Sequence, residues 1–245
     1  MEEKQLVKKS HIIPDCMYRN FSDEHNSYVE VLPEELLDQN SLSRRRRSGI
    51  YEGDILCKNC ETIISKFESY GCPILYSEGT LNPKIAINAK HFTTNKGKTF
   101  STLENLDYTK FKLFLLSIIW RCSISNRVEF ASVKLSPGHE ETLRQMILTG
   151  DAKSIRDYPI IFSYLKNDLK SSEILIPPHK VRRDYFNTYR FVITRFIFDF
   201  YITEGKSIMN SLEEATLKPS GSVLIFHFDT KDYIKDLILA KGKNS

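Results

Sequence analysis

The hydrophobic spacing of residues 107–122 predicts the clearest helix in the chain. Phe111, Phe114, Leu115 and Ile118 recur at helical intervals, and further apolar residues widen this stripe over most of the helix surface. A helix that is apolar almost all round belongs in the centre of a hydrophobic core. We therefore expect this segment to be a core element.

The C-terminal half alternates between helical and strand-like patterns. A helix is predicted over residues 139–149, where Gly150 provides a stop. Tyr189–Ile202 is rich in Phe, Val, Ile and Tyr, and Ser222–Phe228 alternates between apolar and polar positions, as strands do. A final helix is expected from about Lys231.

The N-terminal part is more polar and its expected elements are shorter. Apolar β-branched residues before Pro14 predict a short strand, and the proline at the start of residues 33–39 suits the first position of a helix. Gly71 marks the expected end of another helix. The predicted elements are a strand ending at Pro14, a helix over Pro33–Gln39, an exposed loop over 41–49, a strand over Asp54–Cys57 and a helix over Cys60–Tyr70.

A turn-rich stretch over residues 77–105 separates these two halves. It contains Gly79, Pro83 and the Asn95–Lys98 turn, which favour a boundary between modules. The predicted fold class is α+β. We expect a small ββα module over 1–78 with a basic-loop insertion, a linker over 79–105, and a mixed helical and β domain over 106–245.

Composition and charge narrow the class of protein and its expected location. Of the 245 residues, 41% are hydrophobic and 27% are charged, which suits a folded protein. The net charge is +4, but the charges are unevenly distributed. Residues 1–70 carry 10 Lys and Arg against 13 Asp and Glu, so the surplus of basic residues lies in residues 71–245. No run of about 18 apolar residues and no signal-peptide core occur, so we expect no membrane association. The odd count of 5 Cys favours reduced thiols and a cytoplasmic location.

The residue pattern with the most chemistry is His11 in Ser10–Pro14, followed 46 residues later by Cys57 and then by Cys60 and Glu61. An imidazole at a strand end can act as a general base, or can simply bond a backbone carbonyl. Two thiols in a Cys-x-x-Cys turn can face one metal ion, pack as buried thiols, or carry redox chemistry. A carboxylate at a helix start can hold a divalent cation.

These residues resemble the HNH, or ββα-metal, endonucleases. In that superfamily a His-Ile-x-Pro strand supplies the general base, and a Leu-Cys-x-x-Cys sequence opens the helix that carries a metal ligand. The resemblance places His11 on the base, Cys57 and Cys60 on a zinc knuckle, and Glu61 on the ligand position. A wider likeness to bacterial HNH-like proteins extends through Trp120–Ser125.

The chain also departs from that pattern. Ser10 stands where the acidic metal ligand is usual, and a first Cys-x-x-Cys knuckle is absent upstream of His11. Cys16 and Cys72 are the remaining candidates to complete a structural Zn²⁺ site, because one knuckle supplies only half of a tetrahedral set. The resemblance implies a catalytic Mg²⁺ or Mn²⁺ held partly by Glu61. Glu68 follows seven residues later on the same helix face and could contribute to the metal site.

Two basic clusters are candidate nucleic-acid contacts. Guanidinium and ammonium groups suit phosphate oxygens, although a run of charge is commonly just a solvated surface. In the second cluster Tyr185, Phe186 and Tyr189 are interleaved and could stack on bases. The candidate residues are Arg44, Arg45, Arg46 and Arg47 in the first cluster, and Lys180, Arg182 and Arg183 in the second.

The resemblance therefore implies a metal-dependent endonuclease, with DNA as the favoured substrate. It also implies a role in bacterial defence against phage or in a mobile element. The alternatives are a catalytically inactive DNA-binding module, or an adaptor subunit that packs on a protein partner such as an ATPase.

Overall fold

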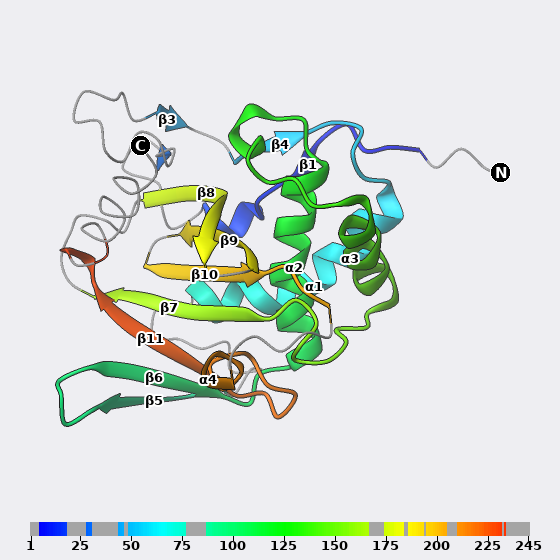
Figure 1. Ribbon diagram of the computed structural model, residues 1–245. Coiled ribbons are helices and arrows are strands. Elements are labelled where there is room, and N and C mark those ends of the chain that lie inside the picture. The colour runs from blue at the N-terminus through cyan, green and yellow to red at the C-terminus, as the bar shows by residue number, and fades with distance from the viewer. Residues whose placement is uncertain are drawn as a thin grey trace.

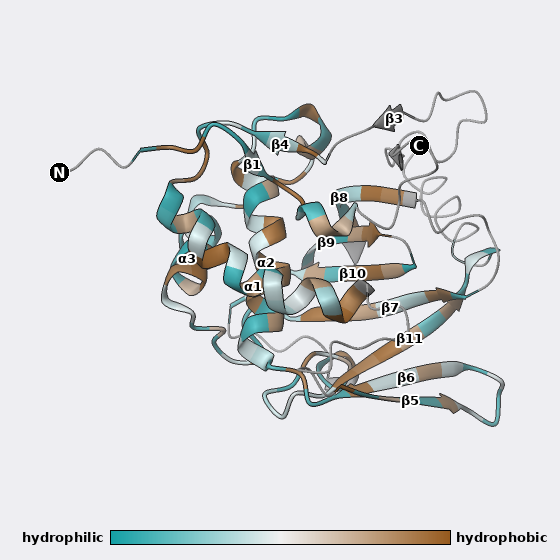
Figure 2. Ribbon diagram, turned by 180° about the vertical axis from the view of Figure 1, so that it is seen from behind, coloured by the Kyte–Doolittle hydropathy of each residue, from teal (hydrophilic) through white to brown (hydrophobic). Residues whose placement is uncertain are grey.

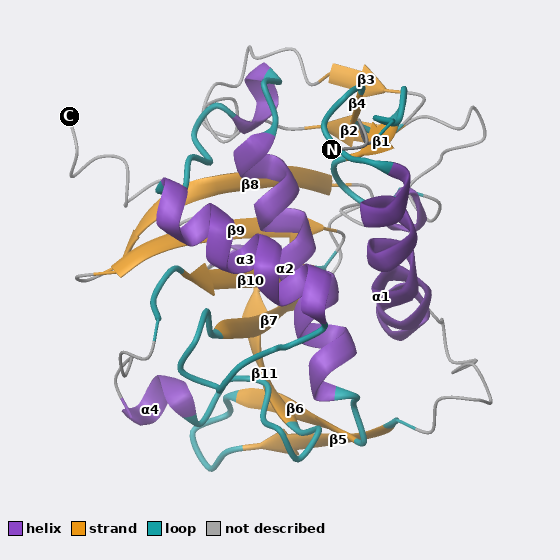
Figure 3. Ribbon diagram, turned by 90° about the vertical axis from the view of Figure 1, so that its right-hand side faces the viewer, coloured by secondary structure: helices purple, strands orange, loops and turns teal. Residues whose placement is uncertain are grey.

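A computed structural model shows a nine-stranded sheet with three helices, α1, α2 and α3, on one of its faces (Figures 1 and 3). The α+β class is thus confirmed. The structure describes residues 5–18, 28–30, 44–46, 49–76, 87–166, 174–183, 186–193, 195–204, 210–231 and 233. Its elements are β1 (Ser10–His11), η1 (Asp15–Met17), β2 (Tyr28–Glu30), β3 (Arg44–Arg46), β4 (Tyr51–Glu52), α1 (Lys58–Tyr76), β5 (Asn88–Thr93), β6 (Thr99–Glu104), α2 (Tyr108–Ile124), η4 (Val128–Phe130), α3 (Pro137–Thr149), β7 (Ile160–Lys166), β8 (Ile174–Arg183), β9 (Phe186–Ile193), β10 (Phe196–Tyr201), α4 (Asn210–Glu213) and β11 (Val223–Asp229).

The large sheet has the order β3-β2-β8-β9-β10-β7-β11-β6-β5. Its pairs are antiparallel except β2 with β8 and β11 with β7, which are parallel. The predicted β character of Tyr189–Ile202 is confirmed by the β9–β10 hairpin, and that of Ser222–Phe228 by β11. β1 and β4 form a separate two-stranded antiparallel sheet.

Helix α2 is the centre of the core, as its pattern predicts. Every residue from Phe111 to Ser123 is buried, and the Asp107 side chain caps the first turn by accepting from the Lys110 amide. One side of the helix packs on the sheet, where the Phe111 and Phe162 rings stack at 5.8 Å; α1 and α3 flank it on the helical layer (Figure 3). Each fully buried Phe or Leu contributes about 1.5–3 kcal/mol through the hydrophobic effect.

Helix α1 does not end at Gly71, so that prediction is wrong. The helix continues through Gly71 and Pro73 to Tyr76. A Cβ on Gly71 would lie only 2.2 Å from Cδ1 of Phe114 on α2. The glycine therefore permits a close approach of two helices and is not a stop. The other predicted stop is confirmed, because Gly150 caps α3 in the left-handed conformation with φ of 72°.

The predicted linker contains structure over its described part. β5 and β6 form a hairpin around the Asn95–Lys98 turn, and β6 joins the large sheet beside β11. Gly97 has φ of 74°, which suits this turn. Residues from both sides of the predicted boundary, such as Ile12 and Phe198, belong to one hydrophobic core.

Several expectations for the N-terminal part need correction. Arg44–Arg46 form strand β3, so an exposed loop is wrong there. The second short strand is Tyr51–Glu52, because Asp54, with φ of 62°, turns the chain before residues 54–57 can extend. The predicted helix at Pro33–Gln39 lies outside the described residues, as does most of the helix expected from Lys231.

Candidate functional site

The short strands β1 and β4 pair with each other just before α1, although β2 and β3, which belong to the large sheet, lie between them in the chain. Ser10 pairs with Glu52 and His11 with Tyr51, and the antiparallel contact continues through the Ile12 amide, which donates to the Ile50 carbonyl at 2.9 Å. An isolated bridge between Leu6 and Cys57 ties the chain start to the beginning of α1. The β1–β4 pair is thus followed by a helix, with α1 starting six residues after β4, and the assignment of these elements to an HNH module stays a prediction.

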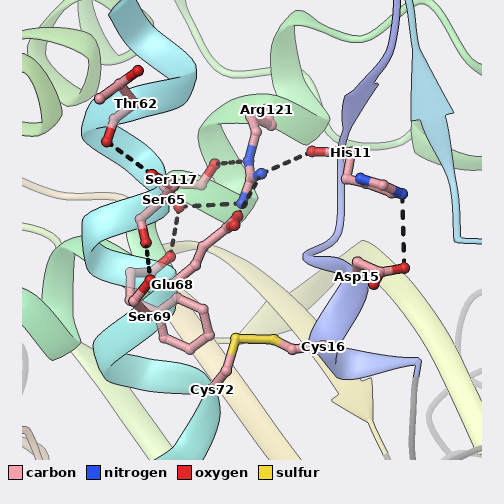
Figure 4. A network of polar contacts seen from close by, with 11 residues as sticks. His11, Asp15, Cys16, Thr62, Ser65, Glu68, Ser69, Cys72, Ser117 and Arg121 are labelled. Carbon is pink, nitrogen blue, oxygen red and sulfur yellow. Dashed lines mark hydrogen bonds and ion pairs between the residues drawn. A yellow bond between two sulfur atoms is a disulfide. The ribbon is translucent and has the colours of Figure 1, made fainter.

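His11 presents its ring on the surface next to an acidic side chain. The side chain of His11 is 34% exposed, and its Nε2 lies 3.9 Å from Oδ1 of Asp15, which is itself half exposed. Figure 4 shows the imidazole directed away from α1 and toward Asp15. The Tyr51 ring meets the imidazole edge at 6.3 Å. Sequence reasoning missed Asp15; its position four residues after a candidate base was the available indication.

A buried arginine connects β1 to both neighbouring helices. Arg121 on α2 is only 2% exposed, and its Nη1 donates to the His11 carbonyl at 2.7 Å. The same Nη1 lies 2.8 Å from Oε1 of Glu68 on α1, and its other nitrogens donate to the Ser117 carbonyl and hydroxyl (Figure 4). Arg121 therefore fixes the backbone that carries the His11 ring.

Glu68 is engaged by this arginine. Its side chain is 25% exposed and its carboxylate neutralises the buried guanidinium. The structure thus brings Glu68 toward the backbone of His11 through Arg121, and the imidazole faces the other way (Figure 4). A direct role of Glu68 in a metal site stays a prediction.

Glu61 lies in the first turn of α1, where the helix dipole favours a negative charge. Its amide donates to the Cys57 carbonyl at 3.0 Å. Its Oε1 is buried without a hydrogen-bond partner among the described residues, and the same holds for Oγ of Ser10 on β1. A buried carboxylate oxygen without a donor is costly, and a bound cation is one way to satisfy it.

The cysteines fall into two groups. Sγ of Cys57 lies 3.1 Å from Sγ of Cys60, with Cys57 just before α1 and Cys60 in its first turn. Cys16 and Cys72 form a disulfide that links η1 to α1, so reduced thiols are wrong for this pair, and neither can complete a zinc site. Cys122 is buried in α2, and burial raises the pKa of its thiol. The thiols of Cys57 and Cys60 alone do not fit a tetrahedral structural Zn²⁺.

The two basic clusters lie on strands of the same half of the sheet. Arg44–Arg46 form β3, which pairs with β2, and β2 pairs with the first residues of β8. Lys180 is exposed on β8, and Arg182 and Arg183 end that strand. Arg47 and Tyr185 lie outside the described residues.

Tyr189, which was a candidate either for base stacking or for the core, is a core residue. Its ring is only 3% exposed, because β9 directs it into the core, and its hydroxyl donates to the Lys134 carbonyl at 2.9 Å. Phosphate contacts by the basic residues stay a prediction.

The described part of the chain lacks two features that bear on its function. No three His, Cys, Asp or Glu side chains there gather closely enough to hold a metal ion. No helix in that part is long and apolar enough to cross a membrane. Comparison with protein-family models, with curated proteins and with solved structures finds no match to this chain.

Proposed function

We propose that this protein is a metal-dependent nucleic-acid endonuclease of the HNH type, with DNA as its favoured substrate. The observation that carries the proposal is the β1–β4 pair before α1, in which His11 ends β1 and Glu61 lies in the first turn of α1 with a buried carboxylate oxygen that has no partner among the described residues. The resemblance to bacterial HNH-like proteins supports a role in phage defence or in a mobile element.

His11 acts as the general base in this proposal. The neutral imidazole accepts a proton at Nε2 from the attacking water, and the nearby Asp15 carboxylate stabilises the imidazolium that forms. Arg121 is a positioning residue, because its bond to the His11 carbonyl fixes where the ring can reach.

Glu61 is the residue that would hold Mg²⁺ or Mn²⁺. Its orphaned oxygen fits a hard cation, which typically keeps several waters and uses one or two carboxylates together with the phosphate of the substrate. Such a cation supplies electrostatic stabilisation of the leaving oxygen.

The test is nicking of a supercoiled plasmid in the presence of Mg²⁺ or Mn²⁺. We expect cleavage by the native protein and a loss of at least about a hundredfold in His11→Ala, the usual contribution of general base catalysis. His139→Ala is the matched control, because His139 lies on α3 and bonds Tyr158 and Glu204 instead. Cleavage by His11→Ala at the native rate would contradict the assignment.

One observation favours a catalytically inactive alternative. The buried Arg121 engages Glu68, and no cluster of three metal ligands occurs among the described residues. The chain would then be a DNA-binding module, or an adaptor subunit packed on a partner such as an ATPase. Binding of DNA that weakens with salt, without cleavage under any divalent cation, would support the first form. Co-purification of a second polypeptide by a chain with no nucleic-acid affinity would support the second.

A further inference from the structure

A row of rings crosses the sheet on the face that carries the helices. Its members lie on four strands at one end of the sheet, with β6 between the first two: His91 on β5, His227 on β11, Tyr164 on β7 and Phe196 on β10. Successive ring centroids lie 6.2, 5.7 and 5.5 Å apart. His91 is exposed and the other three are partly exposed. We name these four residues the ring row.

The strand register explains why the row forms. His227 is the direct partner of Tyr164, and Tyr164 is the direct partner of Phe196, so these side chains share one face. His91 is opposite Ser101, which lies on the strand between β5 and β11. The β5–β6 hairpin and the adjoining strand β11 extend beyond the helices in two views (Figures 2 and 3), so this end of the sheet has no helical cover from α1, α2 or α3.

The two imidazoles are held in place by hydroxyl groups on β6. Oγ of Ser101 lies 2.7 Å from both Nδ1 of His91 and Nε2 of His227, and Nδ1 of His227 lies 3.2 Å from Oγ1 of Thr99. A hydroxyl has a single proton, so Ser101 donates to one ring and accepts from the other. Such fixed rings lose little conformational entropy when a ligand binds.

The electrostatics of the row suit an anionic polymer with flat groups. Burial lowers the pKa of His227, and the nearby Lys166 and His91 lower it further, which disfavours the charged form of this ring. Nη1 of Arg195 lies 3.4 Å from the Tyr164 hydroxyl, and Lys166 follows two residues after Tyr164 on the same face. Asp229 is the register partner of Lys166, so this end of the sheet carries the cations Lys166 and Arg195 with one acid opposite Lys166.

We propose that the ring row binds a single-stranded nucleic acid, with bases on the rings and phosphates at Lys166 and Arg195. Aromatic rings beside cations are what such proteins use, because every base has a face that can stack. The other face of the same strands differs: it bears the stacked pair Phe92 and Phe100 and the exposed Phe228. This inference deepens the proposed nuclease function by naming a substrate class, but binding by the row requires neither His11 nor a metal ion.

The experiment measures fluorescence anisotropy of a labelled single-stranded oligodeoxythymidine in EDTA, where no cleavage occurs. We expect Tyr164→Ala and His227→Ala each to weaken binding about tenfold or more, since one stacked base contributes about 1–3 kcal/mol. Tyr164→Phe keeps the ring and should retain most of the affinity. Phe228→Ala, on the opposite face, is the matched control and should bind like the native protein.

The remaining outcomes separate this inference from the nuclease assignment. Arg195→Ala should lower the slope of log affinity against log salt by about 0.7, the value for one lost phosphate contact on a single strand. His11→Ala should bind normally even though it does not cleave. No binding by the native protein, native affinity in folded Tyr164→Ala, or an equal loss in Phe228→Ala would overturn the inference. Binding of the oligonucleotide by the native protein without any cleavage would instead support the ring row and contradict the nuclease assignment.

Discussion

Replacement of Arg121 by Met should destabilise the protein more than most single substitutions. Methionine keeps much of the length and apolar contact but removes a guanidinium that is 2% exposed. The change leaves the Glu68 carboxylate and the His11 carbonyl without their donor, at 2.8 and 2.7 Å respectively in the native protein. Removal of one partner of a buried pair costs about 3–5 kcal/mol. Because Glu68 is 25% exposed, water compensates part of this, and we expect about 3 kcal/mol.

The assay is equilibrium urea unfolding, followed by fluorescence of the single Trp and by circular dichroism. A double-mutant cycle with Glu68→Gln isolates the pair: the two single changes should not add, and the coupling should be about 1–3 kcal/mol. Arg121→Lys keeps the charge but has no planar fork for the four acceptors of the guanidinium, so it should recover only part of the loss. A cost below about 1 kcal/mol for Arg121→Met, or additive effects in the cycle, would refute this view of how β1 is held in place.

Four further predictions concern stability. Serine at both Cys16 and Cys72 should lower the free energy of unfolding by up to about 4 kcal/mol, because the disulfide closes a loop across a separation of 56 residues; an unchanged urea midpoint would contradict this. Lys112→Met should cost about 2 kcal/mol, since two backbone carbonyls and a Tyr hydroxyl lose a donor; thermal unfolding measures it, and a higher melting temperature would be the opposite result. Gly71→Ala should cost about 1–3 kcal/mol through overpacking against α2, and a neutral change would show that the helices can separate. The hydrogen bond from Tyr158 lowers the pKa of Glu204 in the folded protein, so the ionised carboxylate stabilises the fold above the ordinary carboxyl pKa of 4.5. This stabilisation is lost as the pH falls through the lower folded pKa. The difference in unfolding free energy between the native protein and Glu204→Gln should therefore shrink below pH 4.5, and a difference that grows would refute the linkage.

Elements with a regular spacing of hydrophobic residues were predictable from the sequence. Elements that depend on contacts with distant segments of the chain were not. α2 and α3 show helical spacing with caps at Asp107 and Gly150, so local chemistry and tertiary packing agree. Gly71 led to a wrong helix end because a glycine in a helical pattern can either end the helix or permit close packing against another one. Only the position of Phe114 on α2 decides between these two roles. The β5–β6 hairpin was hidden because its residues depend on pairing with a distant strand, β11.

The candidate site shows the same division. The short strand at His11 and the helix after Cys57 followed from short motifs, because turn and helix-start chemistry is local, whereas the second strand lies at Tyr51–Glu52 and was not predicted there. The role of Arg121 was missed, although a charged residue in the most apolar helix of the chain was visible in the sequence. Lys112 in the same helix is also buried. A charge at such a position needs a partner, but the identity of that partner, Glu68, comes from another helix and is invisible to spacing. The disulfide joins residues 56 apart, and no local pattern pairs them.

The central proposal is that Glu61 holds a cation close enough for His11 to act as the base beside it, although the imidazole is directed away from α1. Paramagnetic Mn²⁺ tests this directly, because a bound ion broadens the NMR signals of protons close to it. The imidazole proton signals of His11 should broaden on Mn²⁺ titration, those of His139 on α3 should stay sharp, and Glu61→Gln should abolish the effect. Uniform broadening of all histidines, or a sharp His11 signal at saturating Mn²⁺, would contradict the claim.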